Sequence, residues 1–250
     1  MAILNISASS KIGCVRANNE DMLLVGETTI RNSKHLQTVD TAHAGRYLMA
    51  LADGMGGHNG GEVASEDTLQ NLKFFFSDMP AGMDACAFNE TICEWLKSIN
   101  FLIAAKGREN EQCKGMGTTL VALAYYEGAY YWMNCGDSRL YHWHDGHLQQ
   151  LTTDHSLNNL LGKAEHSNII TNCIGGGCKT SYIDIKECTQ LAQPDDAFIL
   201  CSDGLSDMIN DARINQLLTE GCDADDLCQA AEDAGGFDNV SVIIIRIHNS

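Results

Sequence analysis

The alternation of apolar and polar residues divides the chain into strands and helices. Residues 3–9 alternate with a period of two, as a half-buried strand does, and residues 22–25 form a second short strand. Residues 47–52 form an apolar run that predicts a buried strand. Beyond residue 115 the runs become short and rich in β-branched and aromatic residues, which favour strands. We expect these later strands at residues 118–125, 129–135, 140–143, 148–151, 198–202 and 240–247.

Four other segments show the helical period. The first covers residues 62–79, and a second helix follows Pro80-Ala81-Gly82, which predicts an antiparallel helical pair packed on a sheet. Two further helices are expected at residues 211–220 and 224–234. The apolar residues expected on the buried faces of the first pair are Leu69, Leu72, Phe76 and Met79, and then Ile92, Trp95, Leu96, Ile99, Leu102 and Ile103.

The turns between the strands indicate how the sheet is connected. Glu127-Gly128 and Asp145-Gly146 suit tight hairpins, so the central strands are expected to form an antiparallel meander. This disfavours the nucleotide-binding folds built on parallel sheets. Residues 26–45 are polar without a readable period, and we interpret them as a hairpin or a loop.

Length and composition restrict the class of protein. The chain has 250 residues, 44% of them hydrophobic, with two prolines and no linker-like segment, so we expect a single domain covering residues 1–250. The 33 acidic and 16 basic residues give a net charge of -17, which disfavours binding to nucleic acid or to anionic membranes. We find no signal peptide or membrane span, and we expect a soluble cytoplasmic protein.

The eleven cysteines do not form Cys-x-x-Cys pairs. Several of them, such as Cys135 and Cys201, lie within apolar strand-like runs. Buried reduced thiols in the cytoplasm explain this pattern better than a disulfide framework or a zinc site, although one bridged pair is left open.

Four aspartates stand at the ends of predicted strands and are the main candidates for chemistry. Asp53, Asp137 and Asp203 follow strands, and Asp238 precedes one. If the strands belong to packed sheets, these carboxylates can converge, and they cannot all remain ionised without cations. Magnesium or manganese would suit carboxylates together with a glycine carbonyl. The alternative is that Asp-Gly merely marks turns, which is how we interpret Asp145-Gly146.

Short motifs near these aspartates carry a resemblance to a known family. In chain order they are Arg16-x-x-Asn19-Glu20-Asp21, Ala52-Asp53-Gly54-Met55-Gly56-Gly57-His58, Gly115-Met116-Gly117-Thr118-Thr119-Leu120, Asn134-Cys135-Gly136-Asp137-Ser138-Arg139, Leu151-Thr152-Thr153-Asp154-His155, Leu200-Cys201-Ser202-Asp203-Gly204-Leu205 and Asp238-Asn239-Val240-Ser241. As a set they closely resemble the metal-dependent protein phosphatases of type 2C. The glycine-rich form after Asp53 is similar to the bacterial branch.

The resemblance implies a fold and a metal site. The implied fold class is α+β, a four-layer sandwich of two central antiparallel sheets flanked by antiparallel helix pairs. The implied site holds two Mn²⁺ or Mg²⁺ ions and a third, more weakly held ion. By this resemblance Asp53 would bridge the two ions, the Gly54 carbonyl would bind one of them, and Asp203 and Asp238 would complete the other. Asp137 would bind the third ion, with Asp203 as its co-ligand. Glu20 and Asp21 would hold metal-bound waters, and Arg16 would bind the substrate phosphate.

The resemblance also implies an activity. A water activated by two metals would hydrolyse phosphoserine or phosphothreonine on proteins. The expected partners are phosphorylated proteins and a cognate bacterial Ser/Thr kinase whose action the enzyme opposes, and we expect a monomer. Two alternatives stay open, namely a pseudo-phosphatase that only binds phosphoproteins and a phosphatase for small metabolites.

Two features depart from the family pattern. Met55 stands where many eukaryotic members carry a histidine that can act as general acid, and His58 lies beyond two glycines. We therefore expect a metal-linked water to protonate the leaving group and His58 to be structural. The flap at residues 155–171 is shorter than is usual in bacterial relatives, which leaves substrate gating and any flap ligand to a third metal open.

Overall fold

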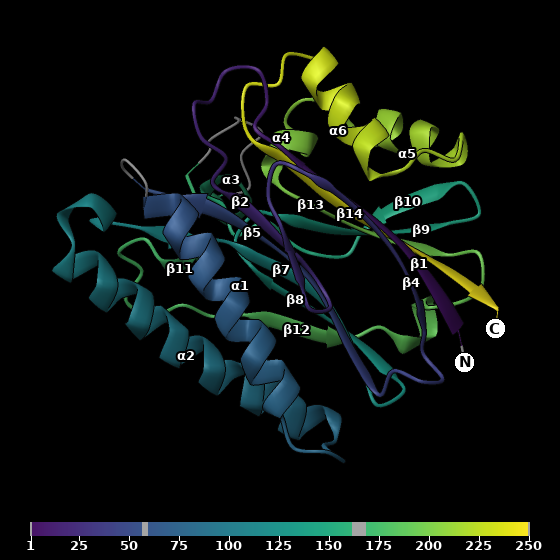
Figure 1. Ribbon diagram of the computed structural model, residues 1–250, viewed down its shortest axis with the longest axis horizontal. Helices are drawn as coiled ribbons and strands as arrows, with labels where there is room; N and C mark the ends of the chain where they lie inside the picture. The colour runs from purple at the N-terminus through teal and green to yellow at the C-terminus, as the bar shows by residue number, and fades with distance from the viewer. Residues whose placement is uncertain (1, 57–59, 162–168, 250) are drawn as a thin grey trace.

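Two antiparallel sheets form the centre of the molecule in the computed structural model, which describes residues 2–56, 60–161 and 169–249 (Figure 1). The first sheet has the order β10 (His147–Gln150), β9 (Arg139–His144), β13 (Ala197–Cys201), β14 (Val240–Asn249), β1 (Ala2–Lys11) and β4 (Lys34–Asp40). The second has the order β11 (Ile174–Gly175), β6 (Gly117–Thr118), β5 (Arg46–Met55), β7 (Leu120–Tyr126), β8 (Ala129–Cys135) and β12 (Asp184–Glu187). In addition, β2 (Asp21–Val25) pairs with β5, and β3 (Thr28–Ile30) pairs with β2.

Helices cover the outer face of each sheet (Figure 1). The second sheet carries α1 (Gly60–Asp78) and α2 (Ala85–Glu109), and the first carries α4 (Asp203–Ser206), α5 (Asp211–Thr219) and α6 (Ala224–Asp233). A short helix, α3 (Leu157–Leu161), and two 3-10 turns at Glu111–Cys113 and Thr189–Leu191 lie in the connections. None of the described helices is long and apolar enough to cross a membrane.

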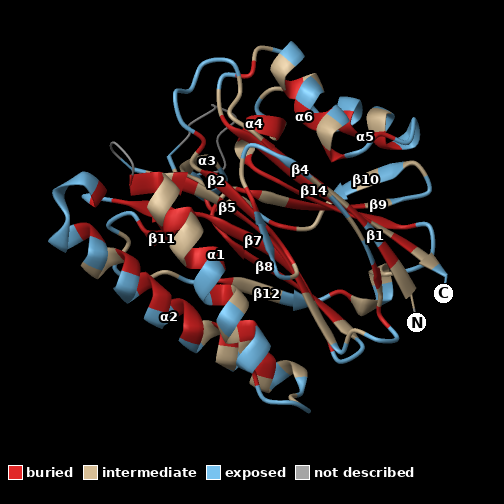
Figure 2. Cartoon of the chain, in the orientation of Figure 1, coloured by how far each residue is buried: buried red, intermediate tan, exposed pale blue. Residues whose placement is uncertain are grey.

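Three separate clusters of buried apolar residues fill the spaces between the four layers. One lies between the helix pair α1 and α2 and its sheet and includes Phe88, one lies between the sheets and includes Phe198, and one lies under α5 and α6 and includes Ile214. Figure 2 shows the corresponding buried strands and inward helix faces. This arrangement confirms the expected four-layer sandwich.

Strand β5 shows why a continuous apolar run is needed at the centre. Alternate residues of a strand point to opposite faces. Leu48 and Ala50 belong to the helix-facing cluster, whereas Met49 and Leu51 belong to the cluster between the sheets. Both faces of this strand are therefore buried, and Asp53 lies half-buried at the end of the apolar run.

The predicted elements are confirmed with small shifts of their ends, but several details were wrong. The expected meander ends after β8, because β9 and β10 belong to the other sheet, where β9 pairs with β13. Segment 26–45 contains β3 and also β4, which pairs with β1 in the other sheet. Its signal was weak because β4 is an edge strand, on which Leu36 is 75% exposed. Strands β6, β11 and β12 were not predicted because each has only two to four residues. Leu102 is 46% exposed, since it lies on the flank of α2 rather than on the buried face.

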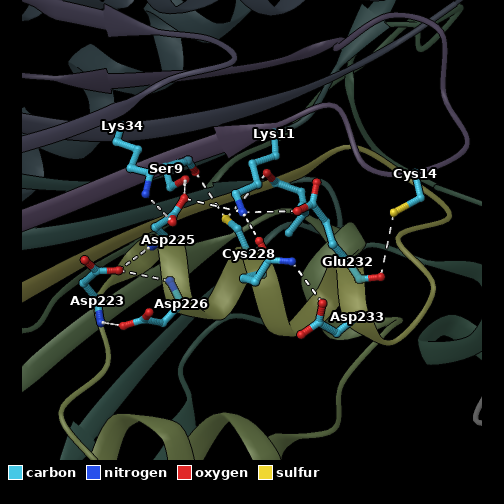
Figure 3. A network of polar contacts seen from close by, with 12 residues as sticks. Ser9, Lys11, Cys14, Lys34, Asp223, Asp225, Asp226, Cys228, Glu232 and Asp233 are labelled. Atoms are coloured by element: carbon cyan, nitrogen blue, oxygen red, sulfur yellow. Dashed lines mark hydrogen bonds and ion pairs between the residues drawn. The ribbon is translucent and has the colours of Figure 1, made fainter.

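Polar contacts fasten α6 to the first sheet (Figure 3). Asp223 caps the helix by accepting hydrogen bonds from the N–H groups of residues 225 and 226. Lys11 of β1 contacts the carboxylates of Asp225, at 3.6 Å, and Glu232, at 3.1 Å. Lys34 of β4 also pairs with Asp225, at 2.5 Å. Strands β1 and β4 are thereby joined through one helix.

Candidate functional site

Asp21 and Asp53 face each other on neighbouring strands. They are opposite in the pairing of β2 with β5. The backbone of Asp53 is fixed by Thr119, whose hydroxyl accepts a hydrogen bond from the Asp53 N–H at 3.0 Å. The Asp53 carbonyl accepts bonds from the Thr118 hydroxyl and the Thr119 N–H, both at 2.8 Å. The sequence had suggested that Asp53 follows its strand. In the structure β5 extends to Met55, so Asp53 lies within the strand.

Asp203 and Asp238 reach the same place from the other sheet. Asp203 is the first residue of α4 and is separated from β13 by Ser202, and Asp238 stands two residues before β14, to which β13 is paired. The hydroxyl of Ser202 donates to the Asp21 carboxylate at 2.9 Å, which joins the two sheets at this point. The Asp203 and Asp53 carboxyl groups lie close enough for each to shift the pKa of the other.

The fifth aspartate, Asp137, follows β8 and lies half-buried beside the group, with one carboxylate oxygen fully buried. Burial raises its pKa to about 7, and the negative charge of Asp203 contributes to the same shift. The structure thus brings Asp21, Asp53, Asp137, Asp203 and Asp238 into one electrostatic group.

Burial and mutual repulsion disfavour the ionised form of four of these carboxyls, those of Asp21, Asp53, Asp137 and Asp203. Burial is the largest cause of each shift, and it raises the pKa of Asp21 to about 7 and that of Asp203 to about 6. The Asp53 pKa also rises well above its ordinary value, through burial and then the charges of Asp21 and Asp203. Such a group gains from a cation that lets all members ionise together.

Unsatisfied oxygen atoms provide a test of whether a cation fits here. One carboxylate oxygen each of Asp21, Asp137 and Asp203 is buried without any hydrogen-bond partner. Buried polar atoms are nearly always paired, so three unpaired carboxylate oxygens in one group fit hard divalent cations. Within the described ranges no three His, Cys, Asp or Glu side chains form a ready-made metal-binding group.

Two glycines allow the backbone segments at the site to touch. A Cβ atom on Gly54 would lie 2.1 Å from the carbonyl oxygen of Gly61 and 2.6 Å from that of Glu20. A Cβ atom on Gly204 would lie 1.9 Å from the Asn239 carbonyl oxygen. No other residue fits at either position without a shift of the backbone.

The loop that carries Arg16 and Glu20 is held against the start of β14. The Arg16 guanidinium donates to the Asp238 carboxylate at 2.5 Å, and this bond raises the pKa of Arg16. Burial raises the pKa of Glu20, whose carboxylate accepts a bond from the Gly61 N–H. In this structure the side chain predicted to grip phosphate thus neutralises one of the carboxylates.

Two residues that support the site were missed in the sequence. The Asn239 side chain accepts from the Glu20 N–H at 2.8 Å and donates to two carbonyls of the same loop. Arg31 donates to the Asp21 carbonyl at 2.9 Å and to Ser65 of α1 at 3.0 Å. Asn239 stood within a quoted motif and could have been found there. Arg31 gave no signal, because it lies in a segment without a readable pattern.

Met55, His58 and the flap at residues 155–171 were the positions at which the sequence departs from the family pattern. Met55 is the last residue of β5, three residues beyond the predicted end of that strand at residue 52. His58 and residues 162–168 of the flap lie outside the described residues. The described part of the flap consists of α3 and a bridge between Ser156 and Ile170.

Comparison with known proteins identifies the family. The profile of the protein phosphatase 2C family matches residues 27–233. A putative protein phosphatase 2C-type protein of Streptococcus pyogenes is 33% identical over 263 residues, which cover 97% of each chain.

Solved structures agree with this match. The serine/threonine phosphatase of S. agalactiae is 31% identical, with a TM-score of 0.82 over 97% of this chain and 99% of the other. The catalytic domain of PstP from Mycobacterium tuberculosis, solved with two manganese ions, is 30% identical with a TM-score of 0.74 over all of both chains. The alignment with full-length PstP spans 45% of that protein. The chain belongs to the protein phosphatase 2C family.

Proposed function

We propose that this protein is a metal-dependent phosphatase that hydrolyses phosphoserine and phosphothreonine on proteins. The observation that carries the proposal is the group of buried and half-buried aspartates from both sheets, three of which keep a buried, unpaired carboxylate oxygen. Family membership supports it, because the relatives include serine/threonine protein phosphatases, one of them solved with two manganese ions.

In this proposal the aspartates hold two Mn²⁺ or Mg²⁺ ions. Asp53, with the Gly54 carbonyl, is proposed to bridge the pair, and Asp203 and Asp238 complete the second ion. The ions, when bound, would supply charge neutralisation and an activated water nucleophile. Asp137, close to Asp203, is proposed to hold a third ion.

The remaining residues orient these ligands and the substrate. Glu20 and Asp21 are proposed to fix waters around the ions, with Ser202 holding one Asp21 oxygen at 2.9 Å. If Asp238 served as a metal ligand, Arg16 would lose this partner, and its planar guanidinium would be free to donate two bonds to the substrate phosphate. Because position 55 is methionine, no side chain there can protonate the leaving group.

The proposal extends to the cellular role. The enzyme is proposed to act in the cytoplasm as a monomer and to oppose a Ser/Thr kinase in signal transduction. Among the alternatives, a pseudo-phosphatase is disfavoured because Arg16 and all the aspartates are present. A metabolite phosphatase would be recognised by a preference for small substrates over peptides.

Replacing one carboxylate by an amide tests the proposal. Asp203→Asn removes a charge from the group, so we expect manganese-dependent hydrolysis of an aryl phosphate and of a phosphothreonine peptide to fall at least about 100-fold, or about 2.7 kcal/mol in transition-state stabilisation. The matched control is Asp145→Asn, at an Asp-Gly turn outside the site, where φ is 45° and asparagine is tolerated. Turnover by Asp203→Asn at the wild-type rate would refute the metal assignment.

A further inference from the structure

Three cationic side chains gather in a cleft outside the aspartate group. The cleft has a volume of about 640 Å³ and lies between α2 and the segment after β11. Lys97 and Arg108 enter it from α2, and Lys179 enters from that segment. Among the described residues that line it, none is Asp or Glu, although the chain has 33 acidic residues and 16 basic ones.

These three cations differ from their neighbours because they have no ionic partner within the described part of the chain. Lys106, on the same helix, pairs with Asp67 at 2.6 Å. Lys114, shortly after the helix, pairs with Glu111 at 3.2 Å. In a chain with a twofold excess of carboxylates, three unpaired cations in one cleft leave positive charge available to an outside ligand.

The cleft is built before any ligand arrives. The side chain of Asn100, from α2, accepts a hydrogen bond from the Gly175 N–H at 2.7 Å and donates to the Cys178 carbonyl at 3.2 Å. Ser181 donates to the Cys173 carbonyl. The segment that carries Lys179 is thus fixed to α2 and to its own strand, and a ligand need not order it.

The distance between the cations indicates how long a ligand must be to contact all of them. Lys97 and Arg108 are eleven residues apart on α2, which separates them by about 16 Å along the helix axis. A single phosphate cannot span that distance, whereas an extended peptide of about five residues does. Phe101, 70% exposed, lines the cleft between them and offers an apolar contact.

The cleft is connected to the candidate site through the sheet. Strand β11, which leads into the cleft, pairs with β6, and β6 pairs with β5 at Gly54 and Met55. Two strand spacings amount to about 10 Å. A peptide whose phosphorylated residue lies at the aspartates would pass this distance to β11 and extend beyond it to contact Lys179 in the cleft.

We propose that this cleft is a docking site for an acidic segment, rich in Asp and Glu, of the phosphoprotein substrate. The proposal rests on the proposed function, because it assumes a phosphoprotein substrate. It names three residues, Lys97, Arg108 and Lys179, as determinants of substrate choice. They contact the substrate away from the phosphate and have no part in the hydrolysis itself.

Binding of an unphosphorylated peptide tests the cleft without requiring catalysis. The probe is a fluorescein-labelled peptide of alternating Glu and Asp around one Leu, followed by anisotropy at low salt, with a Gln-substituted peptide for comparison. The triple variant Lys97→Glu, Arg108→Glu and Lys179→Glu should bind the acidic peptide at least about tenfold more weakly than the wild type. Lys186→Glu, an exposed charge reversal on β12, should stay within about twofold.

Kinetics then connect the cleft to substrate choice. The wild type should have a higher kcat/KM for a phosphothreonine peptide with an acidic extension than for one with a Gln extension, and the triple variant should lose this preference. The single variant Lys179→Glu should weaken binding about threefold, and it keeps the test valid if the triple variant does not fold.

Three other results would contradict the docking site or the proposed function. Equal binding of the acidic peptide by the wild type and by a folded variant overturns the docking site. Equally tight binding of duplex DNA or of phosphatidylglycerol vesicles also overturns it, because the cleft would then be a general polyanion surface. If the wild type hydrolyses neither aryl phosphate nor peptide, the proposed function fails, whereas the anisotropy measurement still decides the docking site.

Discussion

At the residue scale, the site depends on positions where no side chain can be accommodated. Gly54 illustrates this, because the carbonyl oxygens of Gly61 and Glu20 occupy the space that a Cβ atom needs. Both neighbours are backbone atoms of segments that carry the site. A methyl group at position 54 therefore has to displace the Arg16–Glu20 loop or the start of α1.

Gly54→Ala is expected to destabilise the fold by more than about 2 kcal/mol, since the added Cβ would lie only 2.1 Å from a backbone oxygen and rotating a side chain cannot relieve that clash. Urea denaturation would measure the change. The matched control is Gly45→Ala, where nothing lies within 4 Å of the added atom, and we expect a change of at most about 0.5 kcal/mol. Equal stability of the two variants would show that the close packing at Gly54 is not required.

Sequence patterns predicted the aspartates of the site but not the residues whose hydrogen bonds hold them in place. Asp53, Asp137, Asp203 and Asp238 were found because each stands at the end of an apolar run, and the structure groups all four. Arg31, Thr119 and Asn239 were not assigned roles, because their roles depend on contacts between segments up to 227 residues apart. Such contacts leave no periodic trace in the chain.

At the element scale, helices and buried strands were predicted more reliably than short or exposed strands. α1 and β14 carry long periodic or continuous apolar runs, and burial enforces those patterns. Edge strand β4 and the two-residue strands are held mainly by backbone pairing, to which side chains contribute little. Their sequences are therefore free to look like loops.

The start of α2 provides a test at this scale. Asp84 is the N-cap, and its carboxylate accepts a hydrogen bond from the Ala87 N–H at 2.8 Å. Asp84→Ala leaves that donor without a side-chain partner and should cost about 1 kcal/mol in thermal or chemical denaturation. Asp84→Asn keeps an acceptor and should stay within a few tenths of a kcal/mol of the wild type. A loss in Asp84→Asn as large as that in Asp84→Ala would assign the effect to charge and not to capping.

At the scale of the whole molecule, the aspartate group opposes the stability of the fold when no cation is bound. The Asp21 and Asp137 carboxyls have an ordinary pKa of 3.8, and burial raises both to about 7 in the folded chain. Between these values the unfolded chain has released protons that the folded chain still holds. Raising the pH through this range therefore favours unfolding.

We accordingly expect the ion-free protein, prepared with a chelator, to lose stability between about pH 4 and about pH 7 and to level off above that range. Other ionisable groups also change stability with pH, so the comparison is made with Asp137→Asn, which removes one buried carboxyl and keeps its shape. The stability of this variant relative to the wild type should rise by a few kcal/mol, in order of magnitude, from pH 4 to pH 7.5. Denaturant titrations at each pH measure the difference.

Manganese is expected to stabilise the folded chain in a pH-dependent way. A divalent ion binds the ionised carboxylates of the folded chain in preference to the unfolded chain, so its stabilisation should grow as the pH rises and protons no longer compete for the same oxygens. Manganese should therefore reduce or reverse the loss of wild-type stability between pH 4 and 7, and it should do so less in Asp203→Asn.

A stability difference between wild type and Asp137→Asn that does not vary with pH would contradict the burial of an ionisable group at position 137. A manganese effect that is the same at pH 5 and pH 7.5 would show that the ion binds away from these carboxylates.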